Sequence, residues 1–135
     1  MKRTIKITFF VVLATLAWAG CSKRYPIDGD GLLITTRTEC YVSNFDLLGS
    51  DFISVVNGSP VIDTTALTVH AEVFFGTDLH NLYPQFSLAQ DCKLDPKITG
   101  AVDFSDTTHP RQYSVISGNR KIKKTYTIYI SVQQP

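Results

Sequence analysis

The strongest constraint on the fold is a two-residue alternation of side chains in two segments of the chain. Apolar residues fill every second position from Leu67 to Phe75, and again from Tyr126 to Val132. Successive side chains of a β-strand point to opposite faces, so this period predicts strands with one buried face. The residues expected to face the core are Leu67, Val69, Ala71, Val73 and Phe75, and then Tyr126, Ile128, Ile130 and Val132.

Shorter runs of the same kind, separated by turn formers, predict further strands. Gln112–Ser117 and the final run flank Ser117-Gly118-Asn119, which favours a hairpin over residues 112–132. The other expected strands are Cys40–Leu47, Asp51–Val56 and Gln85–Ala89. Because no helical period appears after the first 21 residues, the sequence predicts an all-β fold, an antiparallel β-sandwich.

The N-terminus has the pattern of a bacterial lipoprotein signal peptide. Lys2, Arg3 and Lys6 precede an apolar stretch that ends at Ala19-Gly20-Cys21. Such a stretch is shorter than the roughly 20 apolar residues that a membrane-spanning helix needs. We expect cleavage before Cys21 and acylation of its thiol, with palmitate among the acyl chains. The alternative is an ordinary secretion signal followed by a chance cysteine.

Cleavage would leave a chain long enough for one domain of ordinary size. We expect residues 1–20 to be the signal peptide, 21–31 a lipidated cysteine with a flexible tether, and 32–135 a single domain. The chain has 13 basic and 12 acidic residues, and the signal holds three of the basic ones, so the mature protein would be slightly acidic. That balance gives no reason to expect a nucleic-acid partner.

Two cysteines remain in the predicted domain, Cys40 and Cys92. An even number of cysteines in an oxidising compartment is compatible with a disulfide. Two separate buried thiols are the competing interpretation, because Cys40 lies at an expected strand start and Cys92 in a loop.

Several segments together resemble an immunoglobulin-like module of surface lipoproteins from Gram-negative bacteria that import complex glycans. They are residues 66–73, 75–88, 102–105, 113–115 and 124–128, with the sequences ALTVHAEV, FGTDLHNLYPQFSL, VDFS, YSV and KTYTI. The resemblance covers roughly residues 40–133 and implies an immunoglobulin-like β-sandwich linked to polysaccharide utilisation. Such domains often precede a ligand-binding domain, so this chain is either a minimal member or relies on another chain for that function.

No motif in the sequence specifies a reaction. A glycoside hydrolase needs two carboxylates held about 5–9.5 Å apart; Asp103 and Asp106 are one example of such a pair, but carboxylates in turns are usually structural. His70 and Glu72 share a strand face, as two metal ligands would, and His80 and His109 lie in loops that could approach them, but a polar surface face explains the pair equally well. We therefore expect no enzyme activity, no catalytic residues, no cofactor and no metal.

Exposed aromatic side chains are the candidates for ligand contact. Sugar rings present apolar C–H faces that stack on aromatic rings, and a sheet can display such rings at a regular spacing. Phe74 and Tyr129 lie on the less apolar faces of their strands, and Tyr83 lies near a strand end. Their alternative role is structural, at an edge or beneath a loop.

The sequence thus predicts a non-catalytic outer-membrane lipoprotein, facing either the periplasm or the cell surface. Its expected role is a spacer, a docking surface or another accessory part of glycan uptake. The membrane would be a partner through the lipid anchor, and an envelope protein or a glycan would be the second partner. The alternatives are a true glycan-binding protein and a subunit of a surface fibre joined by strand exchange.

Overall fold

The computed structural model describes residues 24–135, so the predicted signal peptide and Cys21 lie outside the described part of the chain. Seven strands make up this part. In chain order they are β1 (Val42–Leu48), β2 (Val61–Asp63), β3 (Thr68–Val73), β4 (Tyr83–Leu88), β5 (Lys93–Asp95), β6 (Arg111–Ile116) and β7 (Lys123–Val132).

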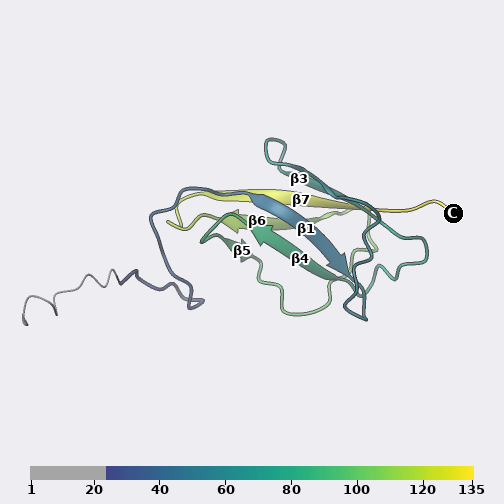
Figure 1. The fold of residues 1–135 in the computed structure, drawn as a ribbon, viewed down its shortest axis with the longest axis horizontal. Coiled ribbons are helices and arrows are strands. Elements are labelled where there is room, and N and C mark those ends of the chain that lie inside the picture. The colour runs from purple at the N-terminus through teal and green to yellow at the C-terminus, as the bar shows by residue number, and fades with distance from the viewer. Residues whose placement is uncertain (1–23) are drawn as a thin grey trace, which may run out of the picture.

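The strands form two sheets that pack face to face as a β-sandwich (Figure 1). One sheet pairs β1 with β4, and the other has the order β2-β3-β7-β6-β5. This arrangement confirms the predicted all-β sandwich, and the β6–β7 hairpin is confirmed as well. The expectation of purely antiparallel pairing is wrong at one place, since β3 runs parallel to β7. Parallel neighbours need a long crossover, which the intervening chain supplies.

The core lies between the sheets and follows the predicted alternation. Val69, Ala71 and Val73 of β3 are buried, as are Tyr126 and Ile128 of β7. In the same core Phe86 of β4 contacts Phe45 of β1 and Tyr113 of β6, with ring centroids 4.9 and 5.0 Å apart. The Tyr126 hydroxyl also accepts a hydrogen bond of 3.4 Å from the Val42 amide, which links the two sheets.

Two expectations about the apolar runs are wrong. The segment expected as a strand at Asp51–Val56 is a turn with two isolated bridges, and Phe52 adopts a positive φ of 60°. Phe75 was expected in the core but is exposed, because β3 ends at Val73 and the chain turns at Gly76, which has a φ of 84°. In both segments a residue with positive φ turns the chain, so the alternation of a strand cannot continue.

The turn between β6 and β7 also differs from the expectation in detail. The residue with positive φ is Arg120, at 61°, rather than Gly118 or Asn119. Gly118 is instead buried against Thr35, Arg37 and Asp91, where a Cβ atom would have no room.

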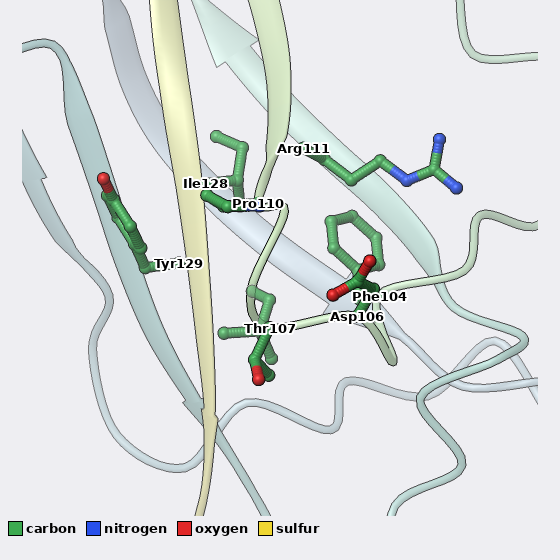
Figure 2. A pocket seen from close by; sticks show the side chains of 8 residues that line it. Phe104, Asp106, Thr107, Pro110, Arg111, Ile128 and Tyr129 are labelled. Carbon is green, nitrogen blue, oxygen red and sulfur yellow. The ribbon is translucent and has the colours of Figure 1, made fainter.

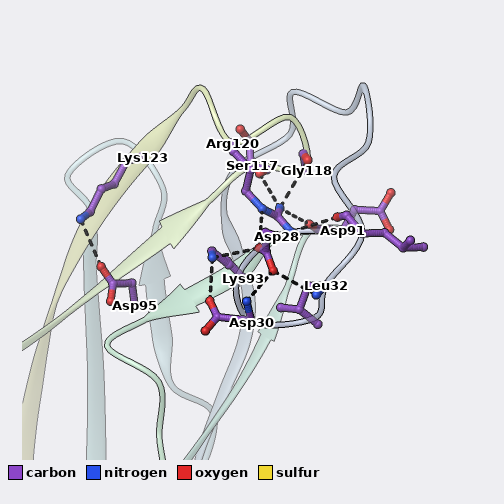
Figure 3. A network of polar contacts seen from close by, with 11 residues as sticks. Asp28, Asp30, Leu32, Asp91, Lys93, Asp95, Ser117, Gly118, Arg120 and Lys123 are labelled. Atoms are coloured by element: carbon purple, nitrogen blue, oxygen red, sulfur yellow. Dashed lines mark hydrogen bonds and ion pairs between the residues drawn. The ribbon is translucent and has the colours of Figure 1, made fainter. Parts of the chain in front are cut away.

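Residues 25–34, which we call the strap, fold back onto this turn (Figure 3). Asp28 lies between Lys93 and Arg120, at N–O distances of 2.9 and 3.0 Å, and Asp30 pairs with Lys93 at 2.7 Å. The Arg120 guanidinium also donates to the backbone oxygen of Leu33 at 2.9 Å. The expected flexible tether therefore differs from the structure at Asp28 and Asp30, which are held by cations of the domain.

Candidate functional site

The outer face of the five-stranded sheet carries a stacked aromatic pair. Parallel pairing places His70 of β3 beside Tyr129 of β7, and their rings stack 4.7 Å apart with an interplanar angle of 11°. Tyr129 is 40% exposed, so part of its ring remains open to solvent. Because the Tyr129 ring is stacked on His70 and partly exposed, its free part can stack against an apolar face of a ligand.

Polar groups continue from this pair along the same strands. Glu72 lies next to Ser131 in the register, and Glu72 Oε1 accepts a hydrogen bond of 2.7 Å from Asn57 Nδ2. A groove of about 250 Å³ runs over this region. Its lining includes Asn57, Ser59, Val61, His70, Glu72, Tyr129 and Ser131. Amide, carboxylate and hydroxyl groups can form hydrogen bonds with the hydroxyls of a saccharide, and the neighbouring aromatic ring can stack on its apolar face.

Phe74 extends this face by one more aromatic ring. It lies two residues beyond Glu72, and its amide donates to the Val55 oxygen at 3.0 Å, so the extended pairing continues past the end of β3. Alternation then places Phe74 on the side of His70 and Glu72, about 13 Å from His70 along the strand. We call His70, Glu72, Phe74, Thr127, Tyr129 and Ser131 the polar–aromatic face.

Tyr83, the third predicted aromatic residue, belongs to the opposite sheet. Its ring packs against Phe52 with centroids 4.7 Å apart and an angle of 42°. Phe52 is 64% exposed and was missed by the sequence analysis, which placed it in a strand. The turn formers Gly49, Ser50 and Asp51, directly before Phe52, are the sequence signal that could have placed Phe52 in a turn. The three predicted aromatic residues therefore do not form one row.

A small cavity lies at the edge of the core near β7 (Figure 2). Figure 2 shows Tyr129 on one side of β7, and Ile128 and Phe104 on the other. The cavity volume is about 30 Å³, which leaves room for little more than a water molecule and none for a sugar ring.

Two carboxylates near this cavity bond within their own turns. Asp103 Oδ1 accepts the Ser105 amide at 2.8 Å, and Asp106 Oδ1 accepts the Thr108 hydroxyl at 2.6 Å. Hydrogen bonds from the side chain and the amide of Ser105 lower the pKa of Asp103, and those from Thr108 and His109 lower the pKa of Asp106. The direction is opposite to that of a glycosidase general acid, whose pKa is raised.

Cys40 and Cys92 are separate thiols in the structure. Cys40 Sγ donates to the Val115 oxygen at 3.1 Å, and Cys92 Sγ donates to the Glu39 oxygen at 3.0 Å. Burial raises the pKa of both thiols, and for Cys92 the neighbouring Cys40 adds to the rise. The disulfide between them stays a prediction.

Within residues 24–135, no group of three or more His, Cys, Asp or Glu side chains is placed to hold a metal ion. No helix in the described part of the chain is long and apolar enough to cross a membrane.

The fold defines a class of protein, an all-β sandwich module, and this one carries partly exposed aromatic side chains on the outer face of its larger sheet. Within that class the chain belongs to the family described as "SGBP, N-terminal", the N-terminal domain of surface glycan-binding proteins, which matches residues 50–130. No curated protein matches the chain.

Solved structures from three Bacteroides species are similar to this chain. A provisionally assigned glycoside hydrolase from Bacteroides thetaiotaomicron is 29% identical over 72% of this chain and 26% of its own length, with a TM-score of 0.59. A DUF4623 family protein from Bacteroides eggerthii is 18% identical over 72% of this chain and 22% of its own, with a TM-score of 0.54. This chain thus spans about a quarter of those two proteins.

A provisionally assigned secreted protein from Bacteroides fragilis is similar over nearly its whole length. It is 13% identical over 71% of this chain and 97% of its own length, with a TM-score of 0.52. At this identity the likeness shows a shared fold alone, as it does for the Bacteroides eggerthii protein.

Proposed function

We propose that this chain is a lipid-anchored accessory protein of the cell envelope that serves glycan utilisation without breaking bonds itself. The observation that carries the proposal is the family match over residues 50–130 to N-terminal domains of surface glycan-binding proteins. The signal pattern ending at Cys21 supports an outer-membrane anchor. The domain would act as an immunoglobulin-like spacer or docking body that holds a glycan or an envelope protein near the membrane.

Growth of the bacterium that encodes this chain tests the proposal. A deletion strain should grow more slowly on at least one polysaccharide as sole carbon source and normally on glucose. The wild-type chain should restore growth, and Cys21→Ser should not, because it removes the acylated thiol. Normal growth of the deletion strain on every polysaccharide that its parent uses would overturn the proposal.

A second candidate function is direct glycan contact at the polar–aromatic face. It is favoured by the spacing of that face, where Glu72 and Ser131 lie between the rings of Tyr129 and Phe74. A glycan chain lying along β7 would meet an aromatic ring, then hydrogen-bonding groups, then a second ring.

Titration of a polysaccharide panel against the Cys21→Ser protein, without its signal peptide, tests this second function. Tyr129→Ala should raise the Kd of the bound glycan about tenfold, which corresponds to roughly 1.4 kcal/mol. Tyr41→Ala is the matched control, because Tyr41 is 42% exposed and lies outside the polar–aromatic face. Equal binding by the two variants would remove the face from consideration.

A further inference from the structure

The strap exposes apolar side chains although it is firmly attached to the domain. Ile27 and Leu33 are 63% and 51% exposed, and Tyr25 and Leu32 are exposed as well. Single exposed apolar side chains are normal on a protein surface, but several gathered in one short segment indicate an interaction surface.

Three of these side chains lie on one side of the strap. Ile27 and Leu33 are bridge partners, flanked by hydrogen bonds of 2.8 Å from Asp28 N to Leu32 O and 2.7 Å from Ile34 N to Pro26 O. This pattern is that of a non-hydrogen-bonded antiparallel pair, whose side chains are close together on one face. Alternation puts Tyr25 on the same side, and Tyr25 and Leu33 line a common groove.

Asp28 points the other way, toward the domain. Its carboxylate is only 10% exposed and bonds to Lys93 and Arg120 (Figure 3). The strap therefore has a polar side that forms ion pairs with the domain and an apolar side that is exposed to solvent.

An acylated Cys21 would bring a phospholipid surface close to the apolar side of the strap. Cys21 precedes Tyr25 by four residues, and an extended chain advances at most about 3.6 Å per residue, so the two residues lie within roughly 14 Å of each other. We propose that Tyr25, Ile27 and Leu33 rest on the phospholipid surface beside the lipid anchor. This inference depends on the acylation of Cys21 in the proposed function.

The chemistry of the strap suits a membrane surface. Tyrosine is favoured at the membrane–water boundary, where its ring is in an apolar layer and its hydroxyl is in water. Arg24, which is exposed, adds a cation that attracts anionic headgroups. Because Asp28 fixes the strap to the domain, contact at the strap would also orient the sandwich on the membrane.

Tryptophan fluorescence tests this inference on the full acylated chain. Removal of residues 1–20 takes away the only tryptophan, so a single new one reports its own surroundings. Leu33→Trp reports on the strap, and Phe75→Trp, at an exposed apolar residue just beyond the end of β3, is the matched control. Both proteins are reconstituted into vesicles of phosphatidylethanolamine and phosphatidylglycerol, with and without brominated acyl chains.

We expect the emission of Leu33→Trp to shift to the blue and to be quenched by brominated lipid, with Phe75→Trp unchanged. If both proteins float with the vesicles but neither is quenched, the anchor stands and the strap contact is overturned. If neither protein floats with the vesicles, the anchor itself has failed. A blue shift of Leu33→Trp that depends on protein concentration without vesicles would assign the surface to a second copy of the chain and overturn the membrane contact.

Discussion

The carboxylate of Asp28 fastens the strap to the rest of the domain. The Lys93 ammonium, together with the amide of Leu32, holds the pKa of Asp28 well below its usual range, and Arg120 contributes to the same effect. The carboxylate is therefore ionised throughout the neutral range. Its two cations belong to β5 and to the β6–β7 turn, so the charge joins the strap to both.

The first prediction concerns the pH dependence of this contact. A carboxyl whose pKa is lower in the folded state stabilises the fold above its unfolded pKa, about 3.9, and loses this effect as the pH falls toward the folded value. Asp28→Asn should therefore lower the free energy of unfolding at pH 7 and reduce its decline below about pH 5. Urea unfolding between pH 3 and pH 7 measures both quantities.

Asp95→Asn is the matched control for this prediction. Asp95 pairs with Lys123 at 3.2 Å, and both side chains are more than half exposed, at 55% and 56%. Such surface pairs contribute about 0–1 kcal/mol. Indistinguishable pH profiles for the two variants would contradict a special role for Asp28.

The second prediction concerns Gly118. A Cβ atom there would lie 3.0 Å from Asp91 Cβ and 3.2 Å from Arg37 Cβ, and it would also meet Thr35 Oγ1. Gly118→Ala should therefore destabilise the protein by about 1–3 kcal/mol, the usual range for overpacking. Gly100→Ala, where nothing lies within 4 Å, should change stability by no more than about 0.5 kcal/mol. A thermal melt of each variant measures the difference. A melting temperature of Gly118→Ala no lower than that of Gly100→Ala would contradict close packing at Gly118.

At the scale of the elements, the long alternating strands could be predicted and the short ones could not. The patterns of β3 and β7 are visible because one face of each is buried over several residues. The three-residue strands β2 and β5 are too short to show a period. Their pairing, like the parallel contact of β3 with β7, depends on residues far away in the sequence.

The same reasoning explains what could be predicted of the candidate site. Tyr129 and Phe74 follow from alternation, because each lies opposite the buried positions of its strand. Phe52 could not be found in this way, since its positive φ belongs to a turn held by hydrogen bonds between Gly49 and Ile53 and between Phe52 and Gly49. The strap was missed because the partners of Asp28 are Lys93 and Arg120, which are distant in the sequence.

The third prediction tests the link between the two sheets. Tyr126→Phe removes the hydroxyl that accepts the Val42 amide and leaves that buried donor without its partner. We expect a loss of about 1–3 kcal/mol in the free energy of unfolding, the usual cost of leaving a buried donor unsatisfied. Tyr113→Phe is the control, because the Tyr113 hydroxyl forms no hydrogen bond with the described residues and the residue is also buried. Equal losses of unfolding free energy for the two variants, measured by chemical denaturation, would show that the hydrogen bond from Val42 to Tyr126 contributes nothing to stability.

At the scale of the whole molecule, β7 holds the larger sheet together. It lies between β3 and β6, so exchange of this strand between copies would divide the five-stranded sheet. This arrangement does not favour a fibre that assembles through its last strand, which was one of the alternatives raised by the sequence.

The fourth prediction is a hierarchy of amide exchange across the molecule. The amides of β7 should exchange slowest, because the strand is paired on both sides. The amides of Asp28 and Ile34 should be slower than those of loop residues 97–101, since they donate to Leu32 and Pro26 within the strap. Hydrogen–deuterium exchange followed by mass spectrometry measures the order. A strap that exchanged as fast as that loop would contradict the attachment described above.

The placement of the strap and of the C-terminus at opposite ends of the long axis has a mechanical consequence (Figure 1). β7 runs along that axis, with its ladders to β3 and β6 on either side. Tension applied between the two ends would act parallel to the strand and perpendicular to its hydrogen bonds. Many of those bonds would then have to shear together instead of opening one after another, so the sandwich would resist being pulled apart from a tethered surface.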